Sequence, residues 1–166
     1  MKKIALIGAA AVLLVAAAIV FLLRAPEPAP PTAAPYELLA DGIGHFDRGE
    51  LEPALEVLRQ VPVGSIEKPE ALYYEGSAHI MLKDYRAAVT SLEQALALES
   101  RNTGVLYALG VAWFKLGEVG LAKGYFSAVL DIDPGDEQAK GLMEIMTGLE
   151  RQSDAESGDG ESPESQ

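Results

Sequence analysis

The hydrophobic residues of this chain form two patterns, a continuous apolar run near the N-terminus and a periodic arrangement in the middle. Ile4 to Leu23 is a run of twenty residues without a charge. As a helix rising about 1.5 Å per residue, it is about 30 Å long, which matches the hydrocarbon core of a bilayer. From Tyr36 to Gly148, apolar residues recur every three or four positions, which predicts amphipathic helices. We therefore expect an all-α chain with one N-terminal transmembrane helix.

The periodic region repeats itself every thirty-four residues, as Gly42, Gly76 and Gly110 show. Each of these glycines has a Leu four residues before it, an Ala twelve residues after it and a large apolar residue sixteen residues after it. These residues are Leu38, Leu72 and Leu106, then Ala54, Ala88 and Ala122, then Leu58, Leu92 and Phe126. A period of this length is typical of stacked helix pairs, and the small residues are expected where two helices cross closely.

This pattern resembles the tetratricopeptide repeat family, whose units place Leu-Gly, aromatic, Ala, aromatic and Pro positions in a fixed order. The third unit carries Leu106, Leu109, Gly110, Trp113, Gly117, Ala122, Phe126 and Pro134. The resemblance implies an α-solenoid of three helix-turn-helix repeats at residues 35–68, 69–102 and 103–136. Pro62 and Gly64 predict an early end for the second helix of the first repeat. Residues 137–149 keep helical spacing and predict a C-terminal capping helix.

The segments that flank this domain of residues 36–149 differ in composition. Residues 1–24 are predicted to be a signal anchor, because a cleaved secretory signal is usually shorter and ends in small residues. Lys2 and Lys3 outweigh Arg24, so the N-terminus is expected in the cytoplasm and the domain in a bacterial periplasm. Residues 25–35 hold five prolines and predict an extended linker. Residues 150–166 are acidic and lack large apolar side chains, which predicts a disordered tail.

Charge and composition narrow the function. The chain has 25 acidic residues against 13 Lys and Arg, a net charge of −12, so binding to nucleic acid is not expected. Cysteine is absent, and only two histidines are present. No phosphate-binding loop, zinc motif or nucleophile elbow occurs, so we expect no catalytic residues, no cofactor and no small-molecule substrate.

In the family that the chain resembles, the first helices of successive repeats line a concave groove. Carried over to this chain, the groove residues are Leu39, Ile43, Phe46, Tyr73, Ser77, Ile80, Met81, Tyr107, Val111, Phe114 and Lys115. Relatives that clamp a terminal carboxylate have Asn and Lys or Arg in these columns. This chain instead has Ile43, Ser77 and Val111, with Asp47, Met81 and Lys115 further along, so the clamp is not expected. The predicted ligand is therefore an amphipathic helix or extended segment of a partner protein. The alternative is that these residues pack on each other, on the capping helix or on the linker.

Two carboxylate–histidine pairs depart from the family pattern. Asp41 and His45, and again Glu75 and His79, are four residues apart and therefore share a helix face. The sharper interpretation is a metal site made by both pairs, and the plainer one is two structural pairs in a packed interface. We predict structural pairs and no metal, and a pH-sensitive interface is a third interpretation.

The sequence thus predicts a membrane-anchored adaptor that binds a partner protein, and no enzyme. Repeats of this kind are similar to those of bacterial factors for secretion, pilus or outer-membrane assembly and cytochrome biogenesis. One alternative is a structural subunit of a membrane complex, held by the small residues of the run from Ile4 to Leu23. Another is a soluble periplasmic binder, released by cleavage.

Overall fold

The computed structural model describes residues 33–158, with side chains up to Gln152, and these residues form seven helices and no strand. The predicted anchor at residues 4–23 lies outside this range. Among the helices that are described, none has the length and apolar character needed to cross a bilayer. The predicted helical solenoid is confirmed, and the membrane segment stays a prediction.

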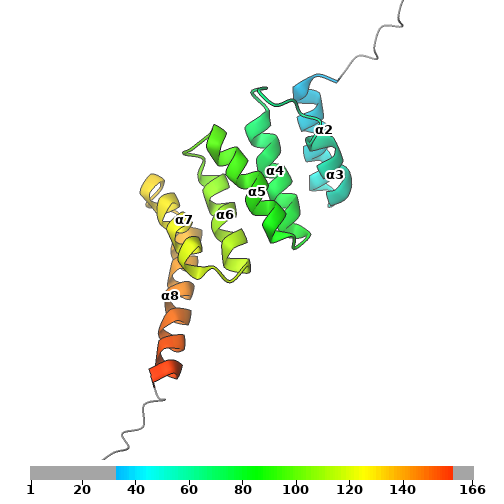
Figure 1. Cartoon of the computed structure of the whole chain (residues 1–166). Coiled ribbons are helices and arrows are strands. Elements are labelled where there is room, and N and C mark those ends of the chain that lie inside the picture. The colour runs from blue at the N-terminus through cyan, green and yellow to red at the C-terminus, as the bar shows by residue number, and fades with distance from the viewer. Residues whose placement is uncertain (1–32, 159–166) are drawn as a thin grey trace, which may run out of the picture. The chain divides into compact units, whose positions relative to one another are not determined.

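The helices follow one another as three hairpins and a final helix (Figure 1). The first hairpin is α2 (Pro35–Asp47) with α3 (Leu51–Leu58), and the second is α4 (Lys68–Met81) with α5 (Tyr85–Leu98). The third is α6 (Thr103–Lys115) with α7 (Val119–Ile132), and α8 (Glu137–Gly158) packs on α7. Each helix contacts the next in the chain, and α4 also contacts α2 and α6. The first helices therefore lie next to one another and form one face.

The glycine of each repeat marks the point where the two helices of its hairpin touch. A Cβ atom on Gly42 would lie 2.5 Å from Leu58 Cδ2, and one on Gly76 would lie 2.4 Å from Leu92 Cγ. On Gly110 it would lie 2.8 Å from Cζ of Phe126. Because real side chains do not approach this closely, only glycine fits there, which explains the thirty-four-residue period.

The turn inside each hairpin also repeats. Gly49, Lys83 and Gly117 have φ values of 75°, 64° and 87°, the left-handed conformation that ends a helix in a Schellman motif. In the second hairpin, the backbone N–H of Asp84 donates to the carbonyl oxygen of His79 and that of Lys83 donates to Ile80. The other two hairpins form the matching bonds. Lys83 is the one non-glycine residue with positive φ in the described range, so the second hairpin bears a conformational cost that the others avoid.

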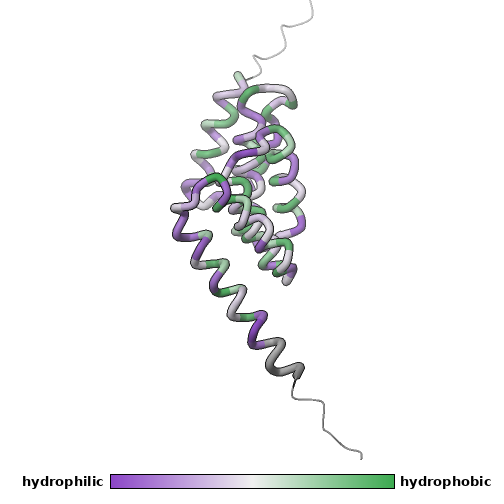
Figure 2. The backbone as a smooth tube through the Cα atoms, turned by 90° about the vertical axis from the view of Figure 1, so that its left-hand side faces the viewer, coloured by the Kyte–Doolittle hydropathy of each residue, from purple (hydrophilic) through white to green (hydrophobic). Residues whose placement is uncertain are grey.

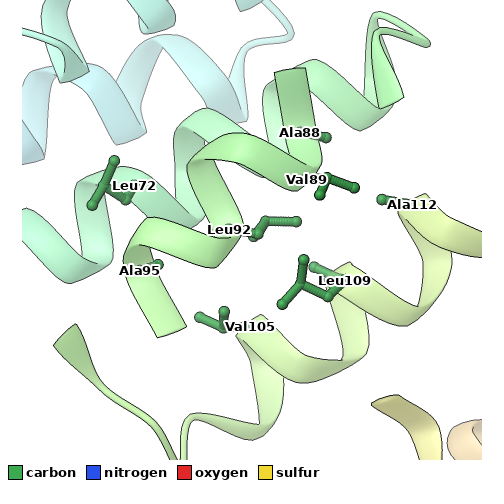
Figure 3. Packing of buried hydrophobic residues seen from close by; sticks show 9 residues of the cluster. Leu72, Ala88, Val89, Leu92, Ala95, Val105, Leu109 and Ala112 are labelled. Atoms are coloured by element: carbon green, nitrogen blue, oxygen red, sulfur yellow. The ribbon is translucent and has the colours of Figure 1, made fainter. Parts of the chain in front are cut away.

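Buried side chains form three clusters in series along the solenoid. The central cluster joins α4, α5 and α6 and is drawn in Figure 3. It contains Leu72, Ala88, Val89, Leu92, Ala95, Val105, Ala108, Leu109 and Ala112. A second cluster joins α6, α7 and α8 around Phe126 and Met146, and a third joins α2, α3 and α4 around Leu58. Each cluster thus joins the two helices of one hairpin to the first helix of the next or to α8, so the hairpins are stabilised both internally and by their neighbours.

Two features at the ends of the domain bear on the predictions. The early end of the first repeat's second helix is confirmed, since α3 ends at Leu58 and is eight residues long. The predicted end of the capping helix at residue 149 is wrong, because α8 continues to Gly158 and carries mixed hydrophobic and hydrophilic positions (Figure 2). Helix-favouring Glu150, Arg151 and Gln152 extend it, and Lys123 Nζ bonds Glu150 Oε2 at 2.6 Å. The remainder of the predicted disordered tail, 159–166, lies outside the described residues.

Replacing Gly76 by alanine tests the helix crossing. We expect Gly76→Ala to lower the free energy of unfolding by about 1–3 kcal/mol, because the new methyl group meets Leu92. Gly124→Ala is the matched control: this α7 glycine has open space at its Cβ position, so the variant should gain up to about 1 kcal/mol from helix propensity. Urea denaturation measures the free energy of unfolding of both variants. Equal changes at the two sites would contradict the close helix contact at Gly76.

Replacing Lys83 tests the turn. Lys83→Gly should raise the free energy of unfolding by about 1 kcal/mol, because glycine adopts positive φ without the clash of a Cβ atom. Lys83→Ala removes the same charge but keeps the Cβ atom, so it should not be stabilised. Thermal unfolding of the two variants separates the backbone effect from the charge.

Candidate partner-binding surface

The predicted groove residues lie on α2, α4 and α6, and the structure divides them by exposure into three groups. Leu39 is 8% exposed and belongs to the buried cluster of the first hairpin, so it presents little surface to a partner. Met81 and Lys115 lie at the ends of α4 and α6 and are exposed. The others are partly buried: Ile43, Phe46, Tyr73, Ser77, Ile80, Tyr107, Val111 and Phe114.

Three aromatic rings form a continuous contact from α2 to α4. The ring centroids of Phe46 and Tyr74 are 5.3 Å apart, and those of Tyr74 and Tyr73 are also 5.3 Å apart, both edge to face. We call Phe46, Tyr74 and Tyr73 the aromatic row. All three rings are partly exposed, and a Cβ atom on Gly104 would lie 3.6 Å from the ring of Tyr73. The row therefore reaches from the first hairpin to the start of α6.

An open pocket of about 370 Å³ lies at the end of the aromatic row, and we call it the tyrosine pocket. Its lining residues are Ile66, Glu70, Tyr73, Tyr74, Glu99, Asn102 and Gly104. Asn102 is held in place at the start of α6, where its Oδ1 accepts from the backbone N–H of Val105 and its Nδ2 donates to Glu99. Burial, followed by the charges of Glu70 and Asp47, raises the pKa of the Tyr74 phenol, so the ring stays neutral.

The α6 part of the predicted groove is more closely packed. Tyr107, Val111 and Phe114 pack against the cluster around Phe126 and Met146, and the rings of Tyr107 and Phe126 are 5.3 Å apart. Since α8 contributes Met146 to this cluster, these side chains are partly supported by the capping helix. The alternative interpretation, that the predicted groove residues pack within the domain, therefore applies to part of α6. The aromatic row is still partly exposed, and the tyrosine pocket is open.

The tyrosine pocket also contains residues that the sequence reasoning did not select. Tyr74, Glu70 and Ile66 were not predicted, and neither were Glu99 and Asn102 from the α5–α6 connection. Tyr74 directly follows a predicted residue, so an aromatic pair at this point was a usable signal. Nothing in the periodicity indicates that the α5–α6 turn approaches α4.

The first carboxylate–histidine pair lies at the turn between α2 and α3. His45 Nε2 is 3.8 Å from Asp41 Oδ1, but its Nδ1 is only 2.6 Å from Glu50 Oε2, which Arg48 also contacts. These hydrogen bonds from Arg48 and His45 lower the pKa of Glu50. The pair is thus part of a local ionic cluster that closes the turn.

The second pair lies between the first two hairpins. Glu75 Oε1 bonds Lys68 Nζ at 3.4 Å, and His79 Nε2 accepts a long 3.5 Å bond from Arg59. We call Arg59, Lys68, Glu75 and His79 the polar joint. Because arginine only donates, the proton of His79 is on Nδ1, and this buried nitrogen has no partner among the described residues. Among the described side chains, no group of three or more His, Cys, Asp or Glu is placed to hold a metal ion, so the two pairs do not combine into one site.

The arrangement described so far is that of a helical-repeat solenoid with aromatic residues on the face formed by its first helices. The model of the tetratricopeptide repeat family matches residues 79–145, from the end of α4 into α8. No curated protein sequence matches the chain. This match covers less than half of the chain, and the structural likenesses below concern the fold of the repeat region.

Three solved structures show the likeness in fold. The first repeat domain of Spaghetti (RPAP3), bound to the HSP90 peptide SRMEEVD, has a TM-score of 0.66 at 22% identity, covering 69% of this chain and 91% of that one. The second domain of human RPAP3, in complex with the HSP70 peptide SGPTIEEVD, has a TM-score of 0.63 at 23% identity, covering 69% of this chain and 98% of that one. MamA from Desulfovibrio magneticus RS-1 has a TM-score of 0.65 at 22% identity, covering 75% of this chain and 69% of that one. The two RPAP3 domains are in complex with peptides, and the tetratricopeptide repeat fold is typically a protein-interaction scaffold without enzyme activity.

The buried imidazole predicts a dependence of stability on pH. Burial, the largest effect, lowers the pKa of His79 from its usual value of 6.5, with Asp84 and Glu75 opposing and Arg59 adding to the shift. The unfolded chain therefore binds the proton more readily, so the free energy of unfolding should fall as pH drops below about 6.5. We expect His79→Gln to flatten this fall between pH 7 and 5, measured by urea denaturation. His45→Gln is the control that should keep it, and an unchanged slope in His79→Gln would contradict the assignment.

Proposed function

We propose that this protein is a membrane-anchored adaptor that binds a segment of a partner protein on the face formed by α2, α4 and α6. The observation that carries the proposal is the aromatic row beside the tyrosine pocket. Partly exposed rings next to a hollow offer large contact area at little conformational cost, as protein-binding sites require. The structural neighbours in complex with HSP90 and HSP70 peptides support the same use of the fold here.

The ligand proposed for this chain differs from those peptides. Both peptides end in EEVD and are acidic. Relatives that clamp a terminal carboxylate use Asn and Lys or Arg, whereas the matching positions here are Ile43, Ser77 and Val111. Without the Asn at these positions and with a single Lys, Lys115, the clamp is incomplete, which favours an internal amphipathic helix or extended segment over a chain terminus.

The membrane part of the proposal rests on the sequence. The charge-free run from Ile4 to Leu23 is long enough to span a bilayer, and the flanking Lys2 and Lys3 favour a cytoplasmic N-terminus. In this proposal the repeat domain lies in a bacterial periplasm. There it would serve an envelope assembly process such as secretion, pilus, outer-membrane or cytochrome biogenesis.

Partner capture tests the binding face. Cross-linking in detergent-solubilised membranes, followed by mass spectrometry, should recover a partner with the native chain and lose most of it with Tyr73→Ala combined with Tyr107→Ala. Tyr85→Ala, which removes a tyrosine from the start of α5, is the matched control and should retain capture. Circular dichroism checks that all variants are helical. If the folded double variant captures the partner as well as the native chain does, the proposed binding function is contradicted.

Replacing residues 4–23 by an unrelated transmembrane helix tests the role of the anchor. An adaptor should keep its partner after the exchange, because the binding face is on the repeats. Loss of the partner would instead support a structural subunit held through its own membrane helix. Recovery of the native chain in the soluble fraction would contradict anchoring altogether.

A further inference from the structure

The tyrosine pocket has a charge as well as a shape. Glu70 lies on the first turn of α4 and Glu99 follows α5, and both are exposed at the pocket. The lining includes no Lys, Arg or His. Among the described side chains, the Glu70 carboxylate has no ion-pair or hydrogen-bond partner, and the Glu99 carboxylate accepts only from the neutral side-chain amide of Asn102. The pocket therefore combines aromatic rings with uncompensated negative charge.

Carboxylates also accompany the rings on either side of the pocket. Asp47 and Glu70 lie close enough to Tyr74 to act on it electrostatically, and Asp136 does the same to Tyr107. The one cation among the predicted groove residues is Lys115, at the far end of α6. The charge of the face thus matches the net charge of −12 of the whole chain.

We propose that the tyrosine pocket takes a Lys or Arg side chain, so that the segment bound by the face is a basic peptide. This inference rests on the proposed adaptor function and specifies its partner. A cation against a tyrosine face gains about 0.5–2 kcal/mol, and its aliphatic stem can cover the exposed Ile66 while the charge meets Glu70 and Glu99. An acidic segment would meet like charge and find no cationic side chain in the lining.

The test uses the full-length chain in dodecyl maltoside micelles, which carry no charge. The labelled protein is applied to an array of random ten-residue peptides at low salt and at about 0.15 M salt. We expect the bound peptides to be enriched in Lys and Arg, and their binding to weaken as salt rises. Enrichment in acidic or uncharged peptides would overturn the proposal while leaving the adaptor function in place.

Matched variants separate the pocket from general attraction to an acidic protein. Glu70→Gln with Glu99→Gln should weaken binding of the selected basic peptides about tenfold. Glu56→Gln with Glu93→Gln removes the same charge from exposed sites on α3 and α5, and it should leave the affinity for these peptides unchanged. Equal weakening by both pairs, or none by the first, would overturn the proposal.

The ring itself provides the last comparison. Tyr73→Ala should lose the basic peptides, and Tyr73→Phe should keep them, because phenylalanine preserves the aromatic face. If Tyr73→Ala keeps the same peptides, charge attraction alone explains their binding, and the proposal that the pocket binds them is overturned. If the native chain binds no peptide at all, the adaptor function fails together with this inference.

Discussion

The contact between each repeat glycine and the side chain sixteen residues later is the constraint on which the solenoid depends. Gly42, Gly76 and Gly110 each lie where a Cβ atom would collide with the facing helix. This absence of a side chain lets the two helices approach closely enough to bury the leucine or phenylalanine between them. Since every hairpin is built on the same contact, the hairpins have similar shapes and can stack with their first helices side by side.

The joints between hairpins are less uniform than the hairpins. The joint between the second and third is apolar, with Leu109 and Val89 in one buried cluster. The joint between the first and second carries Glu75 and His79 at the positions that Leu109 and Trp113 occupy one repeat later. Buried ion pairs repay their desolvation poorly, so this polar joint contributes less stability than an apolar one of equal size. The shortness of α3 reduces the contact there further.

The period alone was sufficient to predict the helix pairs, because the glycine contact requires particular residues at fixed positions. The short α3 was also predicted, since Pro62 and Gly64 disfavour helix at the point where the second helix of the first repeat would continue. The positive φ of Lys83 was not predicted, because lysine at a turn carries no signal of the kind that glycine gives. The partner of Glu75 was also missed: helical spacing pointed to His79, but Lys68 lies on the same helix seven residues earlier and binds it. Tertiary folding, which no spacing encodes, brings the α5–α6 turn to Tyr73.

The aromatic row crosses the polar joint, with Phe46 on one hairpin and Tyr73 and Tyr74 on the next. A polypeptide lying along these rings would therefore bridge the interface between the first and second hairpins, which contains the polar joint. Partner binding and the rigidity of this interface are then thermodynamically linked. Any free energy used to order the interface is subtracted from the binding free energy measured for the partner segment.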